Sequence, residues 1–311
     1  MKIMILGAGA MGSLYGGLLK KAGEDVTLID VNPSHIEAIN KNGLIMQLDE
    51  GNVKVTISAC FAKDFSDQVD LIIVFTKSVY SDTALESVKY AIGKDTIVLS
   101  LQNGIGHEAV MSKYVSTDRI VIGTTNFPSD FVDNGIIRSH GKGATRMMSL
   151  DGHVDNKIEF IRDTFIKAGL NAELSDNVFK SIWEKVAFNS ALNTLTSVTL
   201  LPQGYIGDTV EGKELAHTIV DEVVSVANKK GINADAEHVH QLVNQLFKEH
   251  YQHCPSMLQD VLLKRRTEVA FINGAVVKEA EKLNLKVPAT KVLYQLVSII
   301  EQNYDNQKTS R

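Results

Sequence analysis

The chain has 311 residues, of which 44% are hydrophobic and 22% are charged, and its formal net charge is -5. This composition is typical of a soluble globular protein, and it excludes a disordered chain, a collagen-like repeat and a strongly basic nucleic-acid binder. Because one core stops growing at about 250–300 residues, the length predicts two domains.

Cysteine content and hydropathy narrow the class further. The two cysteines, Cys60 and Cys254, are far apart in sequence, so we expect neither a disulfide framework nor a thiolate metal site. The longest uninterrupted apolar run in the body of the chain, residues 71–75, is far shorter than the ~18 residues of a membrane-spanning helix. We therefore expect a cytoplasmic protein without a membrane partner, a nucleic-acid partner or a bound metal.

The first half of the chain alternates strand-like and helix-like segments. Short runs rich in Val, Ile and Leu, without the alternation of a half-exposed strand, occur at residues 2–6, 25–30, 71–75, 96–101 and 119–123. Such runs are typical of strands buried on both faces of a parallel sheet. Helical segments at 11–22 and 34–42 each end at a glycine. This order predicts a doubly wound α/β domain, with residues 136–150 completing the sheet or its edge.

Helical periodicity dominates from about residue 177 onward. Leu215, Ile219, Val223 and Val226 repeat at the spacing of one helix face, and Gly231 follows as a stop. Two further helices are predicted at 256–283 and 290–303, and the polar tail 305–311 is expected to fray. The change near residue 175 predicts an α/β domain over residues 1–175 and an all-helical domain over residues 176–311.

A glycine-rich loop, Gly7-Ala8-Gly9-Ala10-Met11-Gly12, lies between the first predicted strand and the first predicted helix. In this G-x-G-x-x-G placement the glycines permit a tight turn and close approach to a pyrophosphate, and the helix N-terminus offers N–H groups to the anion. The loop therefore predicts a Rossmann-type dinucleotide site, all six residues contacting the cofactor. An ordinary glycine turn is the structural alternative.

Asp30 follows Gly12 by 18 residues, close to the spacing of the acid that binds ribose. A carboxylate there accepts from the ribose 2′-hydroxyl and repels a 2′-phosphate. Residues 31–35 contain no Lys or Arg that could receive such a phosphate. The residues favour NAD(H) over NADP(H), although Asp30 could also be a turn or helix cap.

Three polar residues recur at every fourth position of an otherwise apolar predicted helix, namely Lys185, Asn189 and Asn193. This spacing places them on one helix face. Because asparagine is a poor helix former, the pattern favours a binding function over a solvated polar stripe. A nucleotide domain followed by a helical domain suggests a dehydrogenase with its substrate in the cleft between domains.

Over essentially its whole length the chain resembles the ketopantoate reductases (2-dehydropantoate 2-reductases). The resemblance is carried by the Gly7–Gly12 loop, LQNGIG at 101–106, the helix of Lys185, SMLQD at 256–260 with RRTE at 265–268, and ING at 272–274. It implies a Rossmann domain, an all-helical domain like the C-terminal domain of 6-phosphogluconate dehydrogenase, and reduction of a small 2-oxo acid by NAD(P)H.

The resemblance also implies a role for each matching residue. Lys185 would be the catalytic acid, since an ammonium can stabilise and protonate the alkoxide left by hydride transfer. Glu268 would lie beside nicotinamide and substrate, and Asn103 would close over both. The remaining expected contacts are to the substrate from Asn189, Asn193 and Ser256, and to the cofactor from Lys77, whose alternative is an ordinary surface lysine.

Some positions depart from the family pattern. The family usually holds NADPH with an arginine just after the second strand, where this chain has Asp30-Val31. Two family asparagines of the substrate region are replaced by Gln203 and His253. The leading hypothesis is a ketopantoate reductase. The alternatives are an NADH-linked D-2-hydroxyacid dehydrogenase for branched or aromatic 2-oxo acids, and a dinucleotide-binding regulator without turnover. The family also suggests a homodimer through the helical domain.

Overall fold

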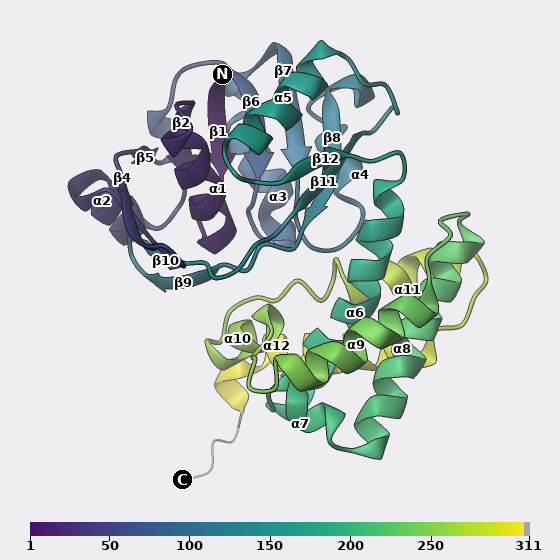
Figure 1. Cartoon of the computed structure of the whole chain (residues 1–311). Helices are drawn as coiled ribbons and strands as arrows, with labels where there is room; N and C mark the ends of the chain where they lie inside the picture. Colours follow the sequence, from purple (N-terminus) through teal and green to yellow (C-terminus); the bar gives the residue numbers. More distant parts are fainter. Residues whose placement is uncertain (308–311) are drawn as a thin grey trace. The chain divides into compact units, whose positions relative to one another are not determined.

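The computed structural model describes residues 1–307, which form two compact units (Figure 1). The first unit comprises Met1–Gln102 and His107–Val178. The second comprises the four-residue segment Asn103–Gly106 and the chain from Phe179 onward. The expected fraying of the tail falls mostly on residues 308–311, which lie outside the described residues, whereas Tyr304–Asn306 form a 3-10 turn, η5.

The first unit is built on an eight-stranded sheet with the order β12-β11-β8-β7-β6-β1-β2-β5. Its strands are β1 (Lys2–Leu6), β2 (Asp25–Ile29), β5 (Ser58–Cys60), β6 (Val69–Val74), β7 (Ile92–Ser100), β8 (Ile120–Thr125), β11 (Thr145–Ser149) and β12 (Ala172–Leu174). Neighbouring strands are parallel except for β11 against β8. The predicted doubly wound parallel sheet is confirmed.

A separate four-stranded sheet has the order β4-β3-β10-β9. It contains β3 (Leu44–Leu48), β4 (Gly51–Val55), β9 (Asp130–Asp133) and β10 (Ile136–Arg138). The expectation that residues 136–150 complete the main sheet is therefore wrong for 136–138, because β10 pairs in parallel with β3 instead. Only β11 of that stretch joins the main sheet.

Helices cover the sheet of the first unit (Figure 1). They are α1 (Ala10–Lys21), α2 (Pro33–Asn42), α3 (Ser81–Ser87), α4 (His107–Met111) and α5 (Asn156–Lys167), with 3-10 turns η1 (Ala62–Asp64), η2 (Ser78–Tyr80), η3 (Lys89–Ala91) and η4 (Thr117–Arg119). The unalternating apolar strands are buried on both faces; Ile3, Met4 and Ile5 of β1 are at most 1% exposed. Burial of this central strand fixes the position of the loop that follows it.

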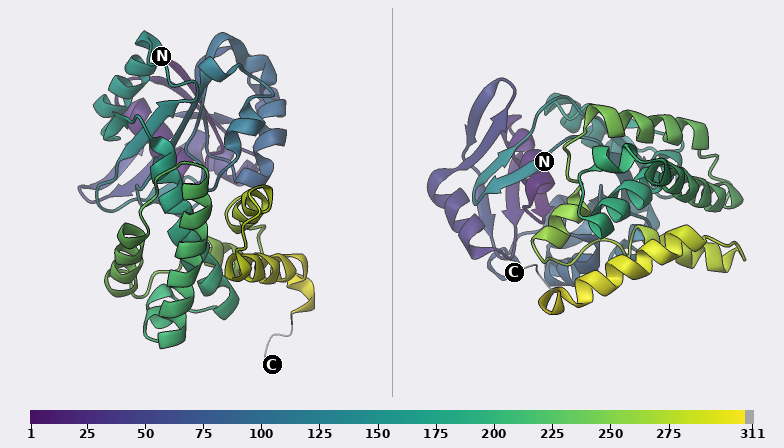
Figure 2. Two further views of the ribbon diagram at one scale, coloured as in Figure 1. Left: turned by 90° about the vertical axis from the view of Figure 1, so that its right-hand side faces the viewer. Right: turned by 90° about the horizontal axis from the view of Figure 1, so that it is seen from below.

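The second unit is helical (Figure 2). Its helices are α6 (Val178–Thr199), α7 (Gln203–Gly207), α8 (Val210–Lys229), α9 (Ala236–Glu249), α10 (Ser256–Leu262), α11 (Asn273–Lys282) and α12 (Pro288–Gln302). Their apolar faces share one core, to which Trp183, Val223, Val239, Val276 and Val297 contribute. The predicted all-helical second domain is confirmed.

The single helix predicted over residues 256–283 is wrong, because α10 ends at Leu262 and α11 begins at Asn273. Lys264 adopts a left-handed backbone with φ of 52°, which ends the helix. The backbone N–H of Arg265 then donates to the Asp260 carbonyl at 2.8 Å. Downstream, the backbone and hydroxyl of Thr267 both donate to Glu301 Oε2. The resulting turn presents Glu268.

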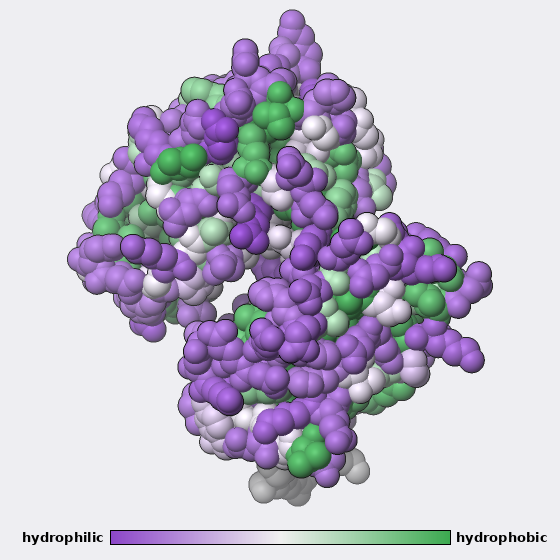
Figure 3. All heavy atoms as spheres, turned by 45° about the vertical axis from the view of Figure 1, so that its right-hand side comes forward, coloured by the Kyte–Doolittle hydropathy of each residue, from purple (hydrophilic) through white to green (hydrophobic). Residues whose placement is uncertain are grey.

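The face of the molecule drawn in Figure 3 is mostly hydrophilic, with separate hydrophobic patches. Within residues 1–307, no helix combines the length and apolarity needed to cross a membrane. The same part of the chain contains no group of three or more His, Cys, Asp or Glu side chains arranged to hold a metal ion.

Candidate active site

Two glycines of the loop after β1 are required by packing. Gly7 has a φ of +99°, and a Cβ there would lie 2.6 Å from the backbone nitrogen of Thr76. A Cβ at Gly12 would lie 1.9 Å from the Gly7 carbonyl oxygen. Contacts this short exclude any side chain, so both positions are reserved for glycine by the tight strand–turn–helix geometry.

Gly9 differs from the other two, because a Cβ there would meet nothing within 4 Å. It is exposed and is the N-cap of α1, whose N-terminus has no side-chain cap; Ala10 and Met11 are the first two helical residues. The first amides of a helix have no intrahelical acceptor and attract an anion. The open space at Gly9 and the uncapped amides fit a pyrophosphate group, as the sequence predicts.

Asp30 organises the turn at the end of β2 and also reaches the glycine loop. Its Oδ2 accepts from the backbone N–H of Ala8 at 2.8 Å. Its Oδ1 accepts from Val31 N–H at 2.8 Å and from Asn32 N–H at 2.9 Å. A carboxylate has about four lone-pair sites, so one on Oδ2 is left for a ligand hydroxyl. Asp30 therefore does form the turn that the sequence offers as its alternative role, and this role does not exclude binding of the ribose.

Lys77 lies in the same unit, three residues after the end of β6, at the N-cap position of η2. Its side chain is half-buried. That position suits a lysine at the carboxyl edge of the parallel sheet, where ligands of doubly wound folds bind. Its predicted contact with the cofactor stays a prediction.

Three residues predicted for the chemistry come together in the second unit, namely Lys185 on α6, Glu268 and Asn103. Asn103 Nδ2 donates to Glu268 Oε2 at 3.4 Å. Burial lowers the pKa of Lys185 to about 8, although the negative charge of Glu268 acts in the opposite direction. A lysine of this kind is a stronger acid than a solvated one and remains mostly protonated at neutral pH.

Asn189 and Asn193 follow Lys185 on α6 at successive four-residue intervals. They are only 8% and 5% exposed. Among the residues that the structure describes, neither side-chain amide makes a hydrogen bond. A side-chain amide can both donate to and accept from the polar groups of a ligand. The pair is thus suited to bind a polar substrate, as the sequence predicts.

The structure does not join Ser256 to this group by a hydrogen bond between described residues. Ser256 is the first residue of α10, after Pro255, and it is exposed. His253, at a family substrate position, is exposed too. Ser256 therefore stays a predicted ligand contact, at the start of a helix in the same unit as Lys185.

Gln203 has a structural role that the family comparison does not suggest. It is 2% exposed, and its Nε2 donates to the carbonyls of Leu246 at 2.9 Å and His250 at 3.1 Å. Both hydrogens of the amide are therefore used to hold the C-terminal end of α9. The expectation that this side chain lines the substrate region is not supported by its contacts.

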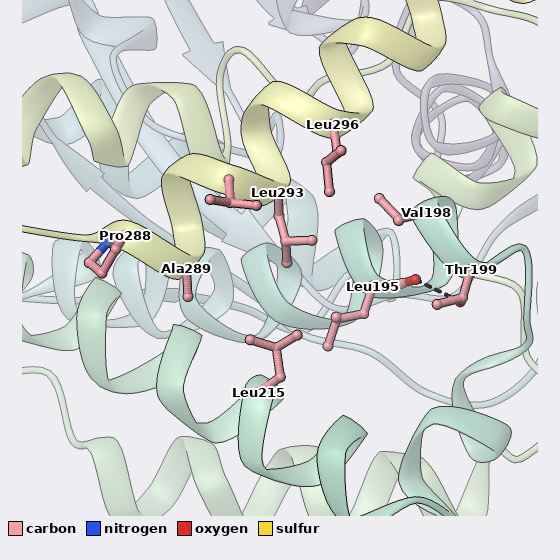
Figure 4. A pocket seen from close by; sticks show the side chains of 9 residues that line it. Leu195, Val198, Thr199, Leu215, Pro288, Ala289, Leu293 and Leu296 are labelled. Carbon is pink, nitrogen blue, oxygen red and sulfur yellow. Dashed lines mark hydrogen bonds between the residues drawn. The ribbon is translucent and has the colours of Figure 1, made fainter.

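An apolar pocket in the second unit is a separate feature from this group of polar residues (Figure 4). Its volume is about 480 Å³, and it is lined by Leu195, Val198, Thr199, Leu215, Pro288, Ala289, Val292, Leu293 and Leu296. The hydroxyl of Thr199 donates to the Leu195 carbonyl at 2.7 Å. No charged side chain lines the pocket, so it is unsuited to the carboxylate of a 2-oxo acid.

Sequence reasoning missed two residues that support the site. Asn273 is fully buried, and its Nδ2 donates to the carbonyl of Ser190 at 3.1 Å, joining the start of α11 to α6. His35 contacts the glycine loop from α2. The only signal for Asn273 is its place in the family-like ING motif, and His35 has no signal beyond following Asp30 closely.

A dinucleotide-type glycine loop in one unit, and a lysine of lowered pKa beside a carboxylate in the other, define a nicotinamide-dependent oxidoreductase. The chain belongs to the ketopantoate reductase family. Residues 3–152 match the family described as Ketopantoate reductase PanE/ApbA, and residues 177–301 match its C-terminal domain.

Individual relatives agree over nearly the full length. The chain is 35% identical over 307 residues to the 2-dehydropantoate 2-reductase of Lactococcus lactis subsp. lactis (strain IL1403), covering 97% of this chain and 98% of that one. The Pyrococcus horikoshii enzyme of the same name is 38% identical over 309 residues, which are 97% of this chain and 98% of that one. The ternary structure of D-mandelate dehydrogenase with NADH and anilino(oxo)acetate superposes with a TM-score of 0.92 at 33% identity. The superposition covers 98% of this chain and 100% of that one.

Proposed function

We propose that this protein is a 2-dehydropantoate 2-reductase, which reduces the C2 ketone of 2-dehydropantoate to pantoate in pantothenate biosynthesis. The observation that carries the proposal is the half-buried Lys185, whose pKa is lowered to about 8 beside Glu268, on the helix that also presents Asn189 and Asn193. The relatives of that name, at 35% and 38% identity over nearly the whole chain, support the choice of substrate.

The cofactor supplies the hydride, and the first unit supplies its binding groups. The Gly7–Gly12 loop and the amides at the start of α1 would hold the pyrophosphate. Asp30 would accept from the adenosine ribose, and Lys77 would contact the cofactor from the end of β6. We propose that residues 1–175 hold the cofactor and residues 176–311 the substrate, with Asn103 contributing to both.

The proton comes from the second unit. A carbonyl that receives a hydride develops negative charge on oxygen, and Lys185 would stabilise this charge and then donate its proton. Glu268 raises the pKa of Lys185 and so opposes its premature deprotonation. Asn189, Asn193 and Ser256 would bind the hydroxyl and carboxylate groups of the substrate, while Asn103 keeps Glu268 oriented through its hydrogen bond.

We propose NADH as the preferred cofactor. In a Rossmann-type site the carboxylate of Asp30 would face the ribose 2′ position, and its negative charge would repel a 2′-phosphate there. The next residue, Val31, is 88% exposed and occupies the place of the arginine that the family usually directs at the phosphate. D-mandelate dehydrogenase, a structural relative, was solved with NADH.

A second candidate is an NADH-linked D-2-hydroxyacid dehydrogenase. It is favoured by the similarity to D-mandelate dehydrogenase and by Gln203, whose amide is turned to the backbone of α9. A site that lacks a polar partner for a substrate hydroxyl discriminates less against apolar 2-oxo acids. A regulator without turnover is disfavoured, because it would not need the grouping of Lys185, Glu268 and Asn103.

The test is an absorbance assay of cofactor oxidation. Ketopantoate and a branched 2-oxo acid without a hydroxyl are each tried with NADH and with NADPH. We expect the highest kcat/KM with ketopantoate and NADH. Activity confined to the branched acid would establish the second candidate, and cofactor binding without turnover of either acid would establish the regulator.

The oligomeric state stays a prediction. We propose a homodimer formed through the helical domain, in keeping with the family resemblance. Light scattering coupled to size-exclusion chromatography measures the mass directly. A mass near twice 34.1 kDa is expected, and a mass of one chain at assay concentration would contradict it.

A further inference from the structure

One imidazole in the first unit is held in a defined protonation state against the glycine loop. His35, the third residue of α2, is 1% exposed. Its Nδ1 accepts from the backbone N–H of Gly135 at 2.9 Å, so this nitrogen carries no hydrogen. A neutral ring must then carry its hydrogen on Nε2, which lies 2.9 Å from the carbonyl oxygen of Ala8. The ring therefore bridges Gly135 and Ala8.

The backbone at Ala8 is fixed from several sides. Its N–H donates to Asp30 Oδ2 at 2.8 Å, and its carbonyl also accepts from the Ser13 hydroxyl at 2.7 Å. The carbonyl of Ala8 belongs to the same planar peptide as the N–H of Gly9, and the two point in opposite directions. Holding the carbonyl toward His35 therefore turns the Gly9 N–H away from His35.

We infer that His35 is a positioning residue for the dinucleotide: its neutral Nε2–H form fixes the Ala8–Gly9 peptide and so orients the loop for the pyrophosphate. The inference rests on cofactor binding at the Gly7–Gly12 loop, which is part of the proposed function. It adds a residue of α2 to a site otherwise built from β1, α1 and the end of β2. It also couples the loop to the β9–β10 hairpin, which contains Gly135.

The surroundings of the ring favour its neutral form. Burial lowers the pKa of His35, against the opposing influences of the Asp30 charge and the Ala8 carbonyl. The groups that cover it from α1 and from the hairpin are uncharged, namely Ser13, the Gly135 amide and Phe131, whose ring centroid lies 5.0 Å away. A protonated ring would direct a second N–H at the Gly135 N–H. Protonation therefore breaks the bridge.

The test compares cofactor binding without substrate in wild type, His35→Leu and His35→Gln. Leucine fills the space without either hydrogen bond, whereas glutamine retains one donor and one acceptor. We expect the Kd for NADH to rise about tenfold in His35→Leu, as for the loss of one hydrogen bond, and to recover in large part in His35→Gln. The kcat at saturating NADH should stay within about twofold of wild type.

Two further measurements separate positioning from general stability. The wild-type Kd should rise as the pH falls through the lowered pKa of His35, whereas both variants should lack this dependence. Nitrogen-15 NMR of the wild type at pH 7 should show the Nε2–H tautomer. A matched control, His240→Leu, removes an imidazole that stacks on His217 in the second unit; it should change thermal stability without changing the Kd.

Several results would overturn the inference. The first two are an unchanged Kd for NADH in a folded His35→Leu protein and an equal rise of this Kd in His240→Leu. The others are the Nδ1–H tautomer in wild type and variants whose Kd depends on pH as the wild-type Kd does. Failure of the proposed function looks different. In that case wild type binds NADH with the expected His35 dependence but reduces neither 2-oxo acid.

Discussion

Lys185 illustrates how burial changes the chemistry of one residue. A solvated lysine has a pKa of about 10.4 and gives up its proton reluctantly at neutral pH. Burial on α6 lowers the pKa of Lys185 to about 8, which brings the acid near the working pH. The sequence alone indicates a lysine on a polar helix face, whereas the size of this shift depends on packing that periodicity cannot report.

The lowered pKa gives the reaction a pH dependence with a definite sign. Reduction needs protonated Lys185, so kcat/KM for the 2-oxo acid should fall as the pH rises through about 8. Oxidation of the 2-hydroxy acid needs the neutral amine and should rise over the same interval. Initial rates in both directions from pH 6 to 10 provide the measurement, and parallel profiles would contradict the assignment of Lys185 as the acid.

Removing the ammonium should abolish chemistry while leaving the cofactor bound. We expect Lys185→Ala to lower kcat by about 10²–10⁴, the range for loss of a general acid, with the Kd for NADH unchanged. The matched control is Lys180→Ala, which removes a half-exposed lysine at the start of the same helix that pairs with Glu184, and it should keep wild-type turnover. Near-normal kcat in Lys185→Ala would refute the role.

Asp30 combines cofactor choice with loop structure. We expect Asp30→Ala to raise the ratio of kcat/KM with NADPH to that with NADH, because the negative charge facing the 2′-phosphate is gone. Affinity for both cofactors should fall as well, because three backbone amides lose their acceptor. Kinetics with both cofactors measure the ratio, and an unchanged ratio would reduce Asp30 to a turn residue.

At the scale of elements, the sequence predicts the sheet better than the break between α10 and α11. Strands buried on both faces are continuous apolar runs, which local composition reports directly. The periodicity of residues 256–283 predicts one helix, because the features that interrupt this helix have no signal in the local sequence. They are the left-handed Lys264 and the bonds from Thr267 to Glu301, which is 34 residues away. His35 and Asn273 were missed for the same reason, since their partners are distant in sequence.

The link between α11 and α6 can be tested by itself. Asn273→Ala removes the side-chain bond to the Ser190 carbonyl inside the core. We expect the free energy of unfolding to fall by about 1–3 kcal/mol, the cost of losing a buried hydrogen bond and its packing. Denaturant unfolding gives the value. Asn303→Ala, which removes an exposed bond to Ile299, should cost much less, and equal losses would contradict the structural role of Asn273.

At the scale of the whole molecule, the segment Asn103–Gly106 stands out, because it lies between parts of the first unit in sequence but belongs to the second. Its attachment is through Phe271, whose carbonyl accepts from Ile105 N–H at 3.1 Å. Gly104 makes this approach possible, since a Cβ there would lie 2.4 Å from the Phe271 oxygen. The segment thereby brings Asn103 to Glu268.

Gly104→Ala should therefore displace the segment and lower both kcat and the melting temperature. The matched control is Gly106→Ala, because Gly106 also has a positive φ, of +93°, but a Cβ there meets nothing within 4 Å. Both variants bear the left-handed backbone cost of about 1 kcal/mol, and only Gly104→Ala adds the clash. Turnover and thermal unfolding measure the difference, and identical effects would show that backbone conformation alone matters.

The same segment sets a rule for recombining this protein with its relatives. A chimera made by a single crossover near residue 178 joins a foreign helical half to a Gln102–His107 connection inherited from the other parent. The asparagine that meets Glu268 would then come from one lineage and the carboxylate from the other. A functional exchange of the helical half therefore has to include residues 103–106 from the same parent. The two segments that must be exchanged together are not contiguous in the sequence.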